Sequence, residues 1–380
     1  MAGLPRSADV VIIGAGAIGT AIAYHLARKG ARSILILERE MVGAGSTSKA
    51  AGGIRVEFPL KVEVEFSLRG IEFFKRFRDE MGGAECDFRQ EGYLFLLTTE
   101  GDVARFRKNQ AVQHALGADS RMISAQDARE LVPSMRVDDV LAAVWGPHDG
   151  HASPNDVVQA YAAQARARGV TIAEETAVTG IVVEDGRVVA VDTSAGRVAT
   201  RLCINAAGPW APLVGEMAGL RIPVDPRRRH IFVTDAFTEV KHPIPLLTDR
   251  STGFYCRSEQ GAVLMSAGDI GKQTEYTATV DWGMLEEAVG KAVNRIPVLE
   301  SAQVRHAWAG LRPLTPDEHA IIDWAPGVEG LFLAVGFCGH GFQHSYATGQ
   351  MTAEWLLDGK PSLDLSELSI ARFAGLTQGG

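Results

Sequence analysis

The stretch WAGLRPLTPDEH contains an arginine, Arg312, in largely apolar surroundings. A guanidinium that is partly withdrawn from water needs an anionic partner, and its planar fork suits a carboxylate. The partner is either a neighbouring acid, Asp317 or Glu318, or the carboxylate of a small-molecule ligand. The sequence shows neither an obvious paired general acid and base nor a Ser, His and Asp arrangement for hydrolysis. Arg312 is therefore the first candidate for the chemistry of this chain.

A second candidate site is the glycine run in DVVIIGAGAIG, where glycines occupy positions 14, 16 and 19. A G-x-G-x-x-G motif between a strand and a helix permits a tight turn, and it lets a pyrophosphate approach the helix N-terminus. Glu38 follows Gly19 by 19 residues at the end of the strand SILILE, where an acid holds ribose hydroxyls. Arg39 beside it is either a contact to a 2′-phosphate or, as we prefer, a surface arginine. The motif alone does not separate NAD from FAD.

The loop GSTSKAAGG, which follows the acid-bearing strand by a few residues, favours FAD. Its small residues and hydroxyls let the backbone come close to a long ligand. Two later segments, 205–212 and 336–344, also place glycines at the ends of strands. Ligands of open α/β sheets bind beyond the carboxyl ends of the strands. These strand ends therefore predict one elongated ligand that is held by segments from the whole chain.

The elements that must position these residues alternate between strand and helix. Residues 9–38 predict a strand, a tight turn, a helix and a second strand. A helix follows over about 61–81, where apolar residues recur every three or four positions. Residues 171–205 predict a meander, and the C-terminal helix after GFCGHGFQH ends at Gly359. The order of these elements predicts an α/β fold.

The bulk properties bound the class of protein. With 380 residues the chain is long enough for about two domains, and a net charge of −8 without a basic block argues against nucleic-acid binding. The four cysteines are far apart and form no CxxC pair, so neither a disulfide framework nor a metal site is expected. The N-terminus lacks a signal-peptide pattern and no apolar run reaches transmembrane length, so a cytoplasmic protein is expected. Loose attachment to a membrane or to a partner subunit stays open.

Five motifs occur together in the order seen in one known family: the glycine fingerprint at 14–19, GSTSKAAGGIR, NAAGPWA, WAGLRP and GFCGHGF. By these motifs the chain resembles, over nearly its whole length, the D-amino acid oxidase superfamily. That group includes glycine oxidase, sarcosine oxidases, amino-acid dehydrogenases and the flavin subunits of dye-linked proline dehydrogenases. The resemblance implies an α/β fold in which a Rossmann-type FAD-binding domain is interleaved with a substrate domain that has a large mixed sheet. The FAD-binding domain would comprise 1–85, 150–222 and 318–380, and the substrate domain 86–149 and 223–317.

The resemblance also implies roles for single residues. In this family the arginine of the G-[LF]-R-P motif, here Arg312, binds the substrate carboxylate. Arg55 resembles an arginine that helps to bind the carboxylate in monomeric sarcosine oxidase, and a salt bridge to Glu57 is the alternative. Tyr255 lies where the family often has a tyrosine beside the substrate. His230, which follows three arginines, belongs either to the site or to a solvated basic edge.

The start of the C-terminal helix is implied to face the flavin. Its free N–H groups and partial positive charge would lie toward the pyrimidine edge, where charge grows on reduction. His340 at this point is either part of the site or a packed histidine. The residues implied to form the FAD site are Gly14, Ala15, Gly16, Ala17, Ile18, Gly19, Glu38, Arg39, Gly45, Ser46, Thr47, Ala51, Gly52, Gly53, Val178, Ala207, Gly208, Trp210, Gly310, Gly339, His340, Gly341, Phe342 and Gln343.

Some positions differ from monomeric sarcosine oxidase. Gly310 falls on the cysteine that links the flavin there, so FAD is expected to be bound non-covalently. Gln343 falls on a lysine that contacts the carboxylate, and Arg312 replaces a tyrosine and would supply the charge instead. The oxygen-activating lysine falls near Ser266, which favours a dehydrogenase that passes electrons to a carrier.

These observations predict FAD-dependent oxidation of the C–N bond of an amino acid or N-alkyl amino acid to an imine, with hydride transfer to flavin N5. The electron acceptor would be oxygen or a carrier, and a partner subunit is an open possibility. One alternative is a 2-hydroxy acid oxidoreductase, which would use the same arginine but needs a base, and His230 or His344 would serve. The other is a flavin-bearing subunit of a multi-subunit dehydrogenase, which would need a partner chain for turnover.

Overall fold

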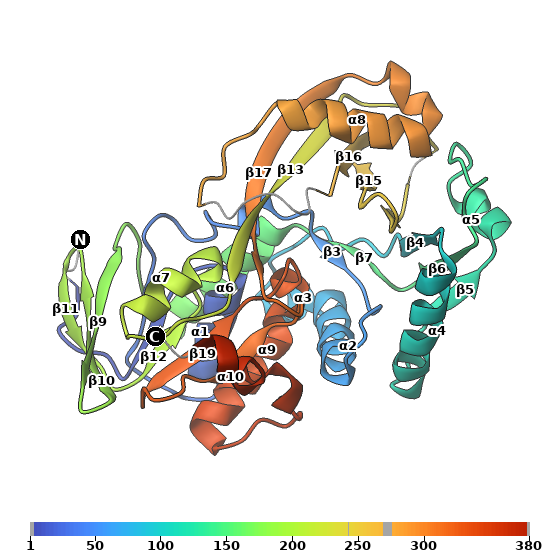
Figure 1. Cartoon of the computed structure of the whole chain (residues 1–380). Helices are drawn as coiled ribbons and strands as arrows, with labels where there is room; N and C mark the ends of the chain where they lie inside the picture. Colours follow the sequence, from blue (N-terminus) through green and yellow to red (C-terminus); the bar gives the residue numbers. More distant parts are fainter. Residues whose placement is uncertain (1–3, 242, 269–275, 378–380) are drawn as a thin grey trace.

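The computed structural model describes residues 4–241, 243–268 and 276–377. The lower part of the molecule in Figure 1 contains a six-stranded sheet in the order β18-β19-β12-β1-β2-β8. β18 pairs antiparallel with β19, and the other neighbouring strands pair in parallel. The strands are β1 (Val10–Ile13), β2 (Ile34–Leu37), β8 (Thr171–Ala173), β12 (Cys203–Asn205), β18 (Ile321–Trp324) and β19 (Leu331–Val335).

The inner strands of this sheet are apolar on both faces because both faces are covered. β1 has the sequence VVII and β2 has ILIL, and every one of these residues is buried. One face packs on the helices α1 (Ala17–Arg28), α6 (Pro154–Arg166) and α9 (Gly341–Asp358). The other face is covered by α7 (Ala211–Glu216) and by a three-stranded sheet of β9 (Val178–Glu184), β10 (Arg187–Thr193) and β11 (Gly196–Ala199).

An eight-stranded sheet extends over the upper and right-hand parts of the molecule in Figure 1, in the order β17-β13-β16-β15-β14-β4-β6-β5. It is mixed, because β14 and β4 pair in parallel whereas the other neighbours are antiparallel. The helix α8 (Gly283–Arg295) packs on its apolar core. The strands are β4 (Tyr93–Leu97), β5 (Arg121–Ile123), β6 (Ala142–Gly146), β13 (Asp225–Thr234), β14 (Leu246–Asp249), β15 (Tyr255–Glu259), β16 (Ala262–Ser266) and β17 (Val304–Leu314).

The long pair β13 and β17 joins the two parts of the molecule. The two strands pair from Asp225 opposite Leu314 to Thr234 opposite Val304. In Figure 1 they run from the upper sheet down to the six-stranded sheet. The pairing therefore carries Arg312, near the end of β17, to the place where the two large sheets face each other.

The structure confirms the predicted α/β fold with a large mixed sheet, and it alters two predicted elements. Of the predicted meander over 171–205, β9, β10 and β11 form an antiparallel sheet, whereas β8 and β12 belong to the six-stranded sheet. The strand, turn, helix and strand over 9–38 are β1, α1 and β2. The predicted helix over 61–81 is interrupted: α2 (Lys61–Lys75) ends at Arg76, and the short α3 (Phe77–Glu80) follows. No glycine or proline marks this position, so the apolar spacing alone could not show the break. The proposed division into domains stays a prediction.

The remaining elements complete the described chain. The helices are α4 (Glu100–Ala115), α5 (Ala125–Leu131) and α10 (Ala374–Thr377), and β3 (Gly53–Ile54) pairs with β7 (Gly150–His151). The 3-10 helices are η1 (Thr47–Lys49), η2 (Gly208–Trp210), η3 (Pro297–Ser301), η4 (Ser366–Leu368) and η5 (Ile370–Phe373). All four cysteines are buried and free. Among the described residues, no helix is long and apolar enough to cross a bilayer, and no cluster has the makings of a metal site.

Candidate active site

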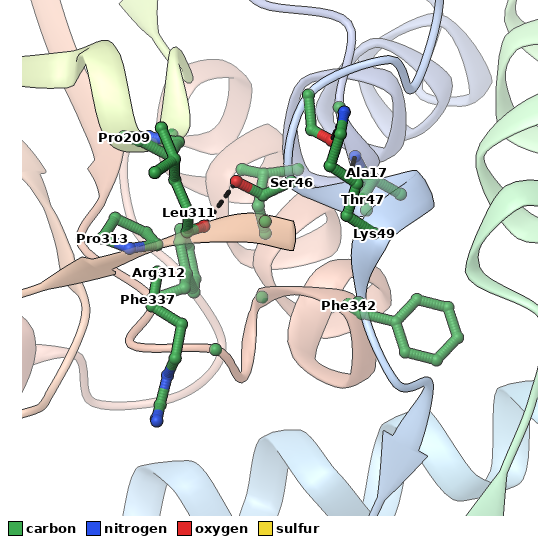
Figure 2. Close-up of a pocket in the computed structure, with 18 of the residues that line it drawn as sticks. Ala17, Ser46, Thr47, Lys49, Pro209, Leu311, Arg312, Pro313, Phe337 and Phe342 are labelled. Atoms are coloured by element: carbon green, nitrogen blue, oxygen red, sulfur yellow. Dashed lines mark hydrogen bonds between the residues drawn. The ribbon is translucent and has the colours of Figure 1, made fainter. Parts of the chain in front are cut away.

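A cavity of about 700 Å³ lies between the two large sheets. Its lining includes residues that follow β1, β2, β12 and β19 of the six-stranded sheet, and strands of the eight-stranded sheet line it as well. The position beyond the carboxyl ends of parallel strands is the one expected for a ligand of an open α/β sheet. Figure 2 shows part of this lining, where the loop after β2, the end of β17 and the starts of α1 and α9 come together.

The glycine fingerprint places the N-terminus of α1 at the cavity. Gly14 has φ +104°, and a Cβ atom there would lie 2.6 Å from the carbonyl oxygen of Ala206, so only glycine fits. The first turn of α1 contains no acidic residue. The Ala17 N–H donates to Thr47 Oγ1 at 3.0 Å. This helix end fits the pyrophosphate of a dinucleotide, because an anion at a helix N-terminus is stabilised by free N–H groups and the helix dipole.

Glu38 is held in place beside this turn. Its carboxylate accepts hydrogen bonds from the Ala15 N–H at 2.8 Å and from the Glu40 N–H at 2.9 Å. Glu38 also lines the cavity, which is the placement required for a contact to ribose hydroxyls. Arg39 packs over the indole of Trp210, with the guanidinium carbon 3.7 Å from the ring centroid. The arginine therefore stacks on an aromatic ring at the cavity.

The glycine- and serine-rich loop after β2 is tied to the strand that carries Arg312. Ser46 Oγ donates to the carbonyl oxygen of Leu311 at 2.6 Å, as Figure 2 shows, and Trp308 Nε1 donates to the Lys49 carbonyl at 3.0 Å. The ammonium group of Lys49 donates to the carbonyl oxygens of Ala44 and Gly45. These bonds hold the cofactor loop and the substrate-side strand in one arrangement.

Arg312 is fastened so that one edge of its fork stays available. Nε donates to the carbonyl oxygen of Cys338 at 3.0 Å, and Nη2 donates to the same oxygen. Gly339 makes this possible, because its φ is +86° and a Cβ atom there would lie 2.6 Å from Arg312 Nε. Within the described chain, Nη1 has no hydrogen-bond partner and Arg312 lines the cavity. The free edge suits a bidentate carboxylate.

Neither of the two acids considered from sequence makes an ion pair with Arg312 among the described residues; Asp317 pairs elsewhere, and Glu318 lines the cavity, where its charge acts on Arg312. Asp317 makes an ion pair with Arg372 at 2.7 Å. Arg295, a buried arginine of α8, shows the structural alternative: Asp139 and Asp249 hold it, each at 2.7 Å. Arg312 has no such carboxylate among the described residues, and burial together with the charge of Arg229 lowers its pKa to about 10. A buried guanidinium without a carboxylate partner is stabilised strongly when an anionic ligand binds beside it.

Arg55 also faces the cavity rather than a carboxylate. It donates to the backbone carbonyl of Glu57, and Nη2 lies 3.4 Å from His340 Nε2. The Glu57 side chain lies buried near Asp149, and burial raises the pKa of both carboxyl groups. The Arg55 guanidinium packs on Phe58, with its carbon 3.8 Å from the ring centroid. The salt bridge to Glu57 considered from sequence is absent among the described contacts.

Gln343 positions Arg55 through the backbone. Its Oε1 accepts from the Arg55 N–H at 3.1 Å, and its Nε2 donates to the Arg55 carbonyl at 3.1 Å and to Ser67 Oγ at 3.0 Å. The side chain is buried, so its amide is used within the protein. Gln343 therefore positions Arg55, and because it also lines the cavity, its contact to the ligand stays a prediction.

The N-terminus of α9 lies at the same cavity and has no acidic residue in its first turn. His340 is its N-cap, and burial together with the charges of Arg55 and Arg312 holds the pKa of His340 well below its usual range. The neutral ring accepts a hydrogen bond from Arg55 at Nε2, because an arginine can only donate. The positive charge at this helix start thus comes from the backbone and the arginines.

Most of the residues predicted for the site line the cavity, and three do not. Ala15 is buried behind the turn, and Gly19 packs against it, because a Cβ atom at Gly19 would lie 2.0 Å from the Gly14 carbonyl oxygen. His230 lies on the other face of β13, where its Nε2 accepts from the Asp281 N–H at 2.9 Å. The predicted residues that line the cavity are Gly14, Gly16, Ala17, Ile18, Glu38, Arg39, Gly45, Ser46, Thr47, Ala51, Gly52, Gly53, Arg55, Val178, Ala207, Gly208, Trp210, Tyr255, Gly310, Arg312, Gly339, His340, Gly341, Phe342 and Gln343.

The structure adds lining residues that sequence reasoning missed. Arg229 and Ile231 face the cavity from β13, because successive side chains of a strand point to opposite faces. The alternation in DPRRRHIFVT was a signal, but it left open which face is inward. Other lining residues that were not predicted include Lys49, Tyr93, Phe95, Leu246, Thr248, Arg250 and Glu318.

A helix N-terminus, an anchored acid and a glycine-rich loop around one long cavity define a dinucleotide-dependent oxidoreductase. A model of the DAO family, described as FAD dependent oxidoreductase, matches residues 9–355, and the chain therefore belongs to this family of FAD-dependent oxidoreductases. The match confirms the resemblance inferred from the five motifs and the prediction of FAD as cofactor.

Individual relatives agree with this family. The chain is 31% identical over 386 residues to the mitochondrial sarcosine dehydrogenase of Mus musculus. This alignment covers 97% of this chain and 42% of that protein. The chain thus spans less than half the length of this curated relative. The structure of L-proline dehydrogenase from P. horikoshii matches with a TM-score of 0.90 at 31% identity, over 98% of this chain and 99% of that chain. Glycine oxidase from Geobacillus kaustophilus matches with a TM-score of 0.85 at 25% identity, over 97% and 99%.

Proposed function

We propose that the protein oxidises the C–N bond of an amino acid or N-alkyl amino acid to an imine. The observation that carries this proposal is Arg312, which lines a cavity that fits FAD, keeps one edge of its guanidinium free and makes no ion pair with a carboxylate of the described residues. The relatives support it, because sarcosine, L-proline and glycine in their names are all amino acids or N-alkyl amino acids. FAD, when bound, supplies a hydride acceptor at N5.

The residues of this chain would act by binding and orientation. Arg312 would hold the substrate carboxylate in a bidentate pair and so fix the direction of the reacting C–H bond. Arg55, whose backbone is held by Gln343, would lie against His340. The N-terminus of α9 would stabilise negative charge that develops at the adjacent part of the cavity. An amine that binds in its neutral form needs no strong base, which agrees with the neutral state of His340.

The structure bears on the hydroxy acid alternative. Such a reaction needs a base for the O–H proton, and the two histidines considered for it are His230 and His344. His230 lies outside the cavity lining, and His344 is buried beside Ser67, where burial lowers its pKa to about 3. We therefore prefer the C–N assignment. Non-covalent FAD, use of an electron carrier rather than oxygen, a possible partner subunit and a cytoplasmic location stay predictions.

The test is anaerobic mixing of the FAD-loaded protein with amino acids, N-methyl amino acids and 2-hydroxy acids, followed by flavin absorbance. Bleaching by one class of amine is the expected result. Bleaching by hydroxy acids alone would overturn the C–N assignment and keep the arginine clamp. If FAD is bound and nothing bleaches it, the reading of the chain as a subunit that needs a partner takes its place.

A further inference from the structure

The substrate end of the cavity carries more positive charge than one carboxylate can neutralise. Four arginines line it: Arg55, Arg229, Arg250 and Arg312. None of the four makes an ion pair with a described carboxylate. The acids that line the cavity are Glu318 and, beside the glycine turn, Glu38 and Glu40. The other lining cations are engaged, since Arg39 packs on Trp210 and the ammonium of Lys49 is bound by backbone carbonyls.

Arg55 and Arg250 lie together against β4. The guanidinium carbon of Arg55 is 5.4 Å from the ring centroid of Phe95. Arg250 follows β14, the parallel neighbour of β4, and its N–H donates to the Leu96 carbonyl at 3.2 Å. The charge of Arg55 contributes to lowering the pKa of Arg250, after burial and Arg105. Both guanidinium groups line the cavity, and neither makes an ion pair with a carboxylate of the described residues, although the charge of Asp102 also acts on Arg250. Together the two groups form a second place for an anion.

Arg55 and Arg312 meet neighbouring residues at the start of α9. Arg55 Nη2 lies 3.4 Å from His340 Nε2, and Arg312 packs where a Cβ atom of Gly339 would lie 2.6 Å from its Nε. The charges of both arginines act on His340, and both line the same cavity. One ligand in this cavity can therefore meet both guanidinium groups, and Arg312 keeps the edge that suits the α-carboxylate.

Resting on the proposed function, we infer that the preferred substrate is an amino acid with a second carboxylate, which Arg55 and Arg250 bind while Arg312 holds the first. The second carboxylate can lie on the nitrogen substituent, as in iminodiacetate, or on the side chain, as in aspartate and glutamate. Arg250 is exposed, so it would meet the ligand at the open side of the cavity.

Binding of acids that cannot be oxidised tests this inference without turnover. The FAD-loaded protein is titrated with malonate and succinate and with the matched monocarboxylates acetate and propionate, and the flavin absorbance change gives each Kd. We expect the dicarboxylates to bind at least about tenfold more tightly, because the second carboxylate reaches Arg55, which is partly buried, and a charge pair withdrawn from water contributes more than an exposed one. Equal Kd values for succinate and propionate would overturn the inference.

The Arg250→Gln variant tests the residue. We expect it to lower the preference for succinate over propionate by about two- to fivefold, because a charge pair at an exposed arginine contributes less than a buried one. Arg105→Gln is the matched control. Arg105 lies close enough to lower the pKa of Arg250, but it pairs with Asp102 and does not line the cavity. Equal weakening of both acids by Arg250→Gln would show a general field effect and refute the assignment. Retention of the flavin spectrum checks that both variants fold.

Reduction of the flavin separates the two sources of the second carboxylate. Faster bleaching by iminodiacetate than by sarcosine places it on the nitrogen substituent, whereas faster bleaching by aspartate or glutamate than by alanine places it on the side chain. If sarcosine and alanine reduce the flavin faster than every dicarboxylate does, the inference is overturned and the proposed function is left intact. Failure of every amine to bleach the flavin would overturn the proposed function, while the titration with malonate and succinate still decides the second anion site.

Discussion

Replacing Arg312 with methionine tests the carboxylate clamp most directly. Methionine keeps an unbranched apolar chain against Gly339 but removes the charge and every donor. In the unchanged protein Nε and Nη2 of Arg312 donate to the Cys338 carbonyl, which leaves one edge of the guanidinium for a bidentate contact to the substrate. The methionine variant removes this one contact. Loss of one partner of a buried charge pair costs about 2–5 kcal/mol. Because the side chain is only partly buried, we expect the lower part of this range, about 2–3 kcal/mol, which is a factor of about 30 to 160.

The assay is the anaerobic rate of flavin reduction as a function of the concentration of the best amine substrate. We expect kcat/KM to fall by this factor, with the flavin spectrum retained. Arg305→Met is the matched control, because Arg305 is an arginine of the same strand whose side chain is 67% exposed and pairs with Asp235 at 3.4 Å. A reduction rate in Arg312→Met equal to that of the unchanged protein, or an equal loss in Arg305→Met, would refute the clamp.

Further predictions follow from other contacts. Gly339→Ala should lower kcat/KM by about tenfold or more in the same assay while FAD stays bound, because φ +86° strains a non-glycine residue by about 1–3 kcal/mol and the new Cβ displaces Arg312; an unchanged rate would count against the packing. Thr47→Val removes the acceptor of an N–H in the first turn of α1 and should weaken FAD retention in a dialysis or flavin-titration experiment, by about 1 kcal/mol; equal retention would contradict it. Acid precipitation should release all of the flavin into solution, since no cysteine stands at position 310, and colour left in the pellet would contradict non-covalent binding. Burial tends to lower the pKa of His319, but the hydrogen bond to Glu63 at 2.9 Å outweighs it and raises that pKa. The pair should therefore stabilise the fold fully below about pH 6.5, and this stabilisation should be lost as pH rises through the raised pKa of the folded state. The difference in unfolding free energy between the unchanged protein and His319→Gln, measured in urea from pH 5 to 9, should shrink as pH rises, and a growing difference would contradict this sign.

The placement of the substrate-side residues depended on long-range pairing. His230 was a predicted site residue, yet Arg229 faces the cavity, because a shift of one residue along a strand exchanges the two faces. Which face of β13 is inward follows from its pairing with β17, whose partner residues lie about eighty positions later. Arg250 is placed by the pairing of β14 with β4, and nothing in its neighbourhood in the sequence connects it with Arg55.

The role of Gln343 shows the same limit. Its position after the GHGF motif predicted a contact to the ligand, and the structure shows its amide bound to the backbone of Arg55 and to Ser67. A single side-chain amide can serve either purpose, and only the neighbours brought together by folding decide between them. The same holds for Arg312, because Asp317 pairs instead with Arg372, which lies 55 residues further along the chain.

The sequence by itself determined the cofactor half of this protein. The strand, the glycine turn, the helix and the acid lie within thirty residues, so local geometry is enough to place a pyrophosphate and a ribose. The tertiary structure decided the substrate half, where arginines from β13, β17 and the segments that follow β3 and β14 meet in one cavity. The physical reason is that charge and hydrogen-bond balance are set by contacts between distant segments, which residue spacing alone does not specify.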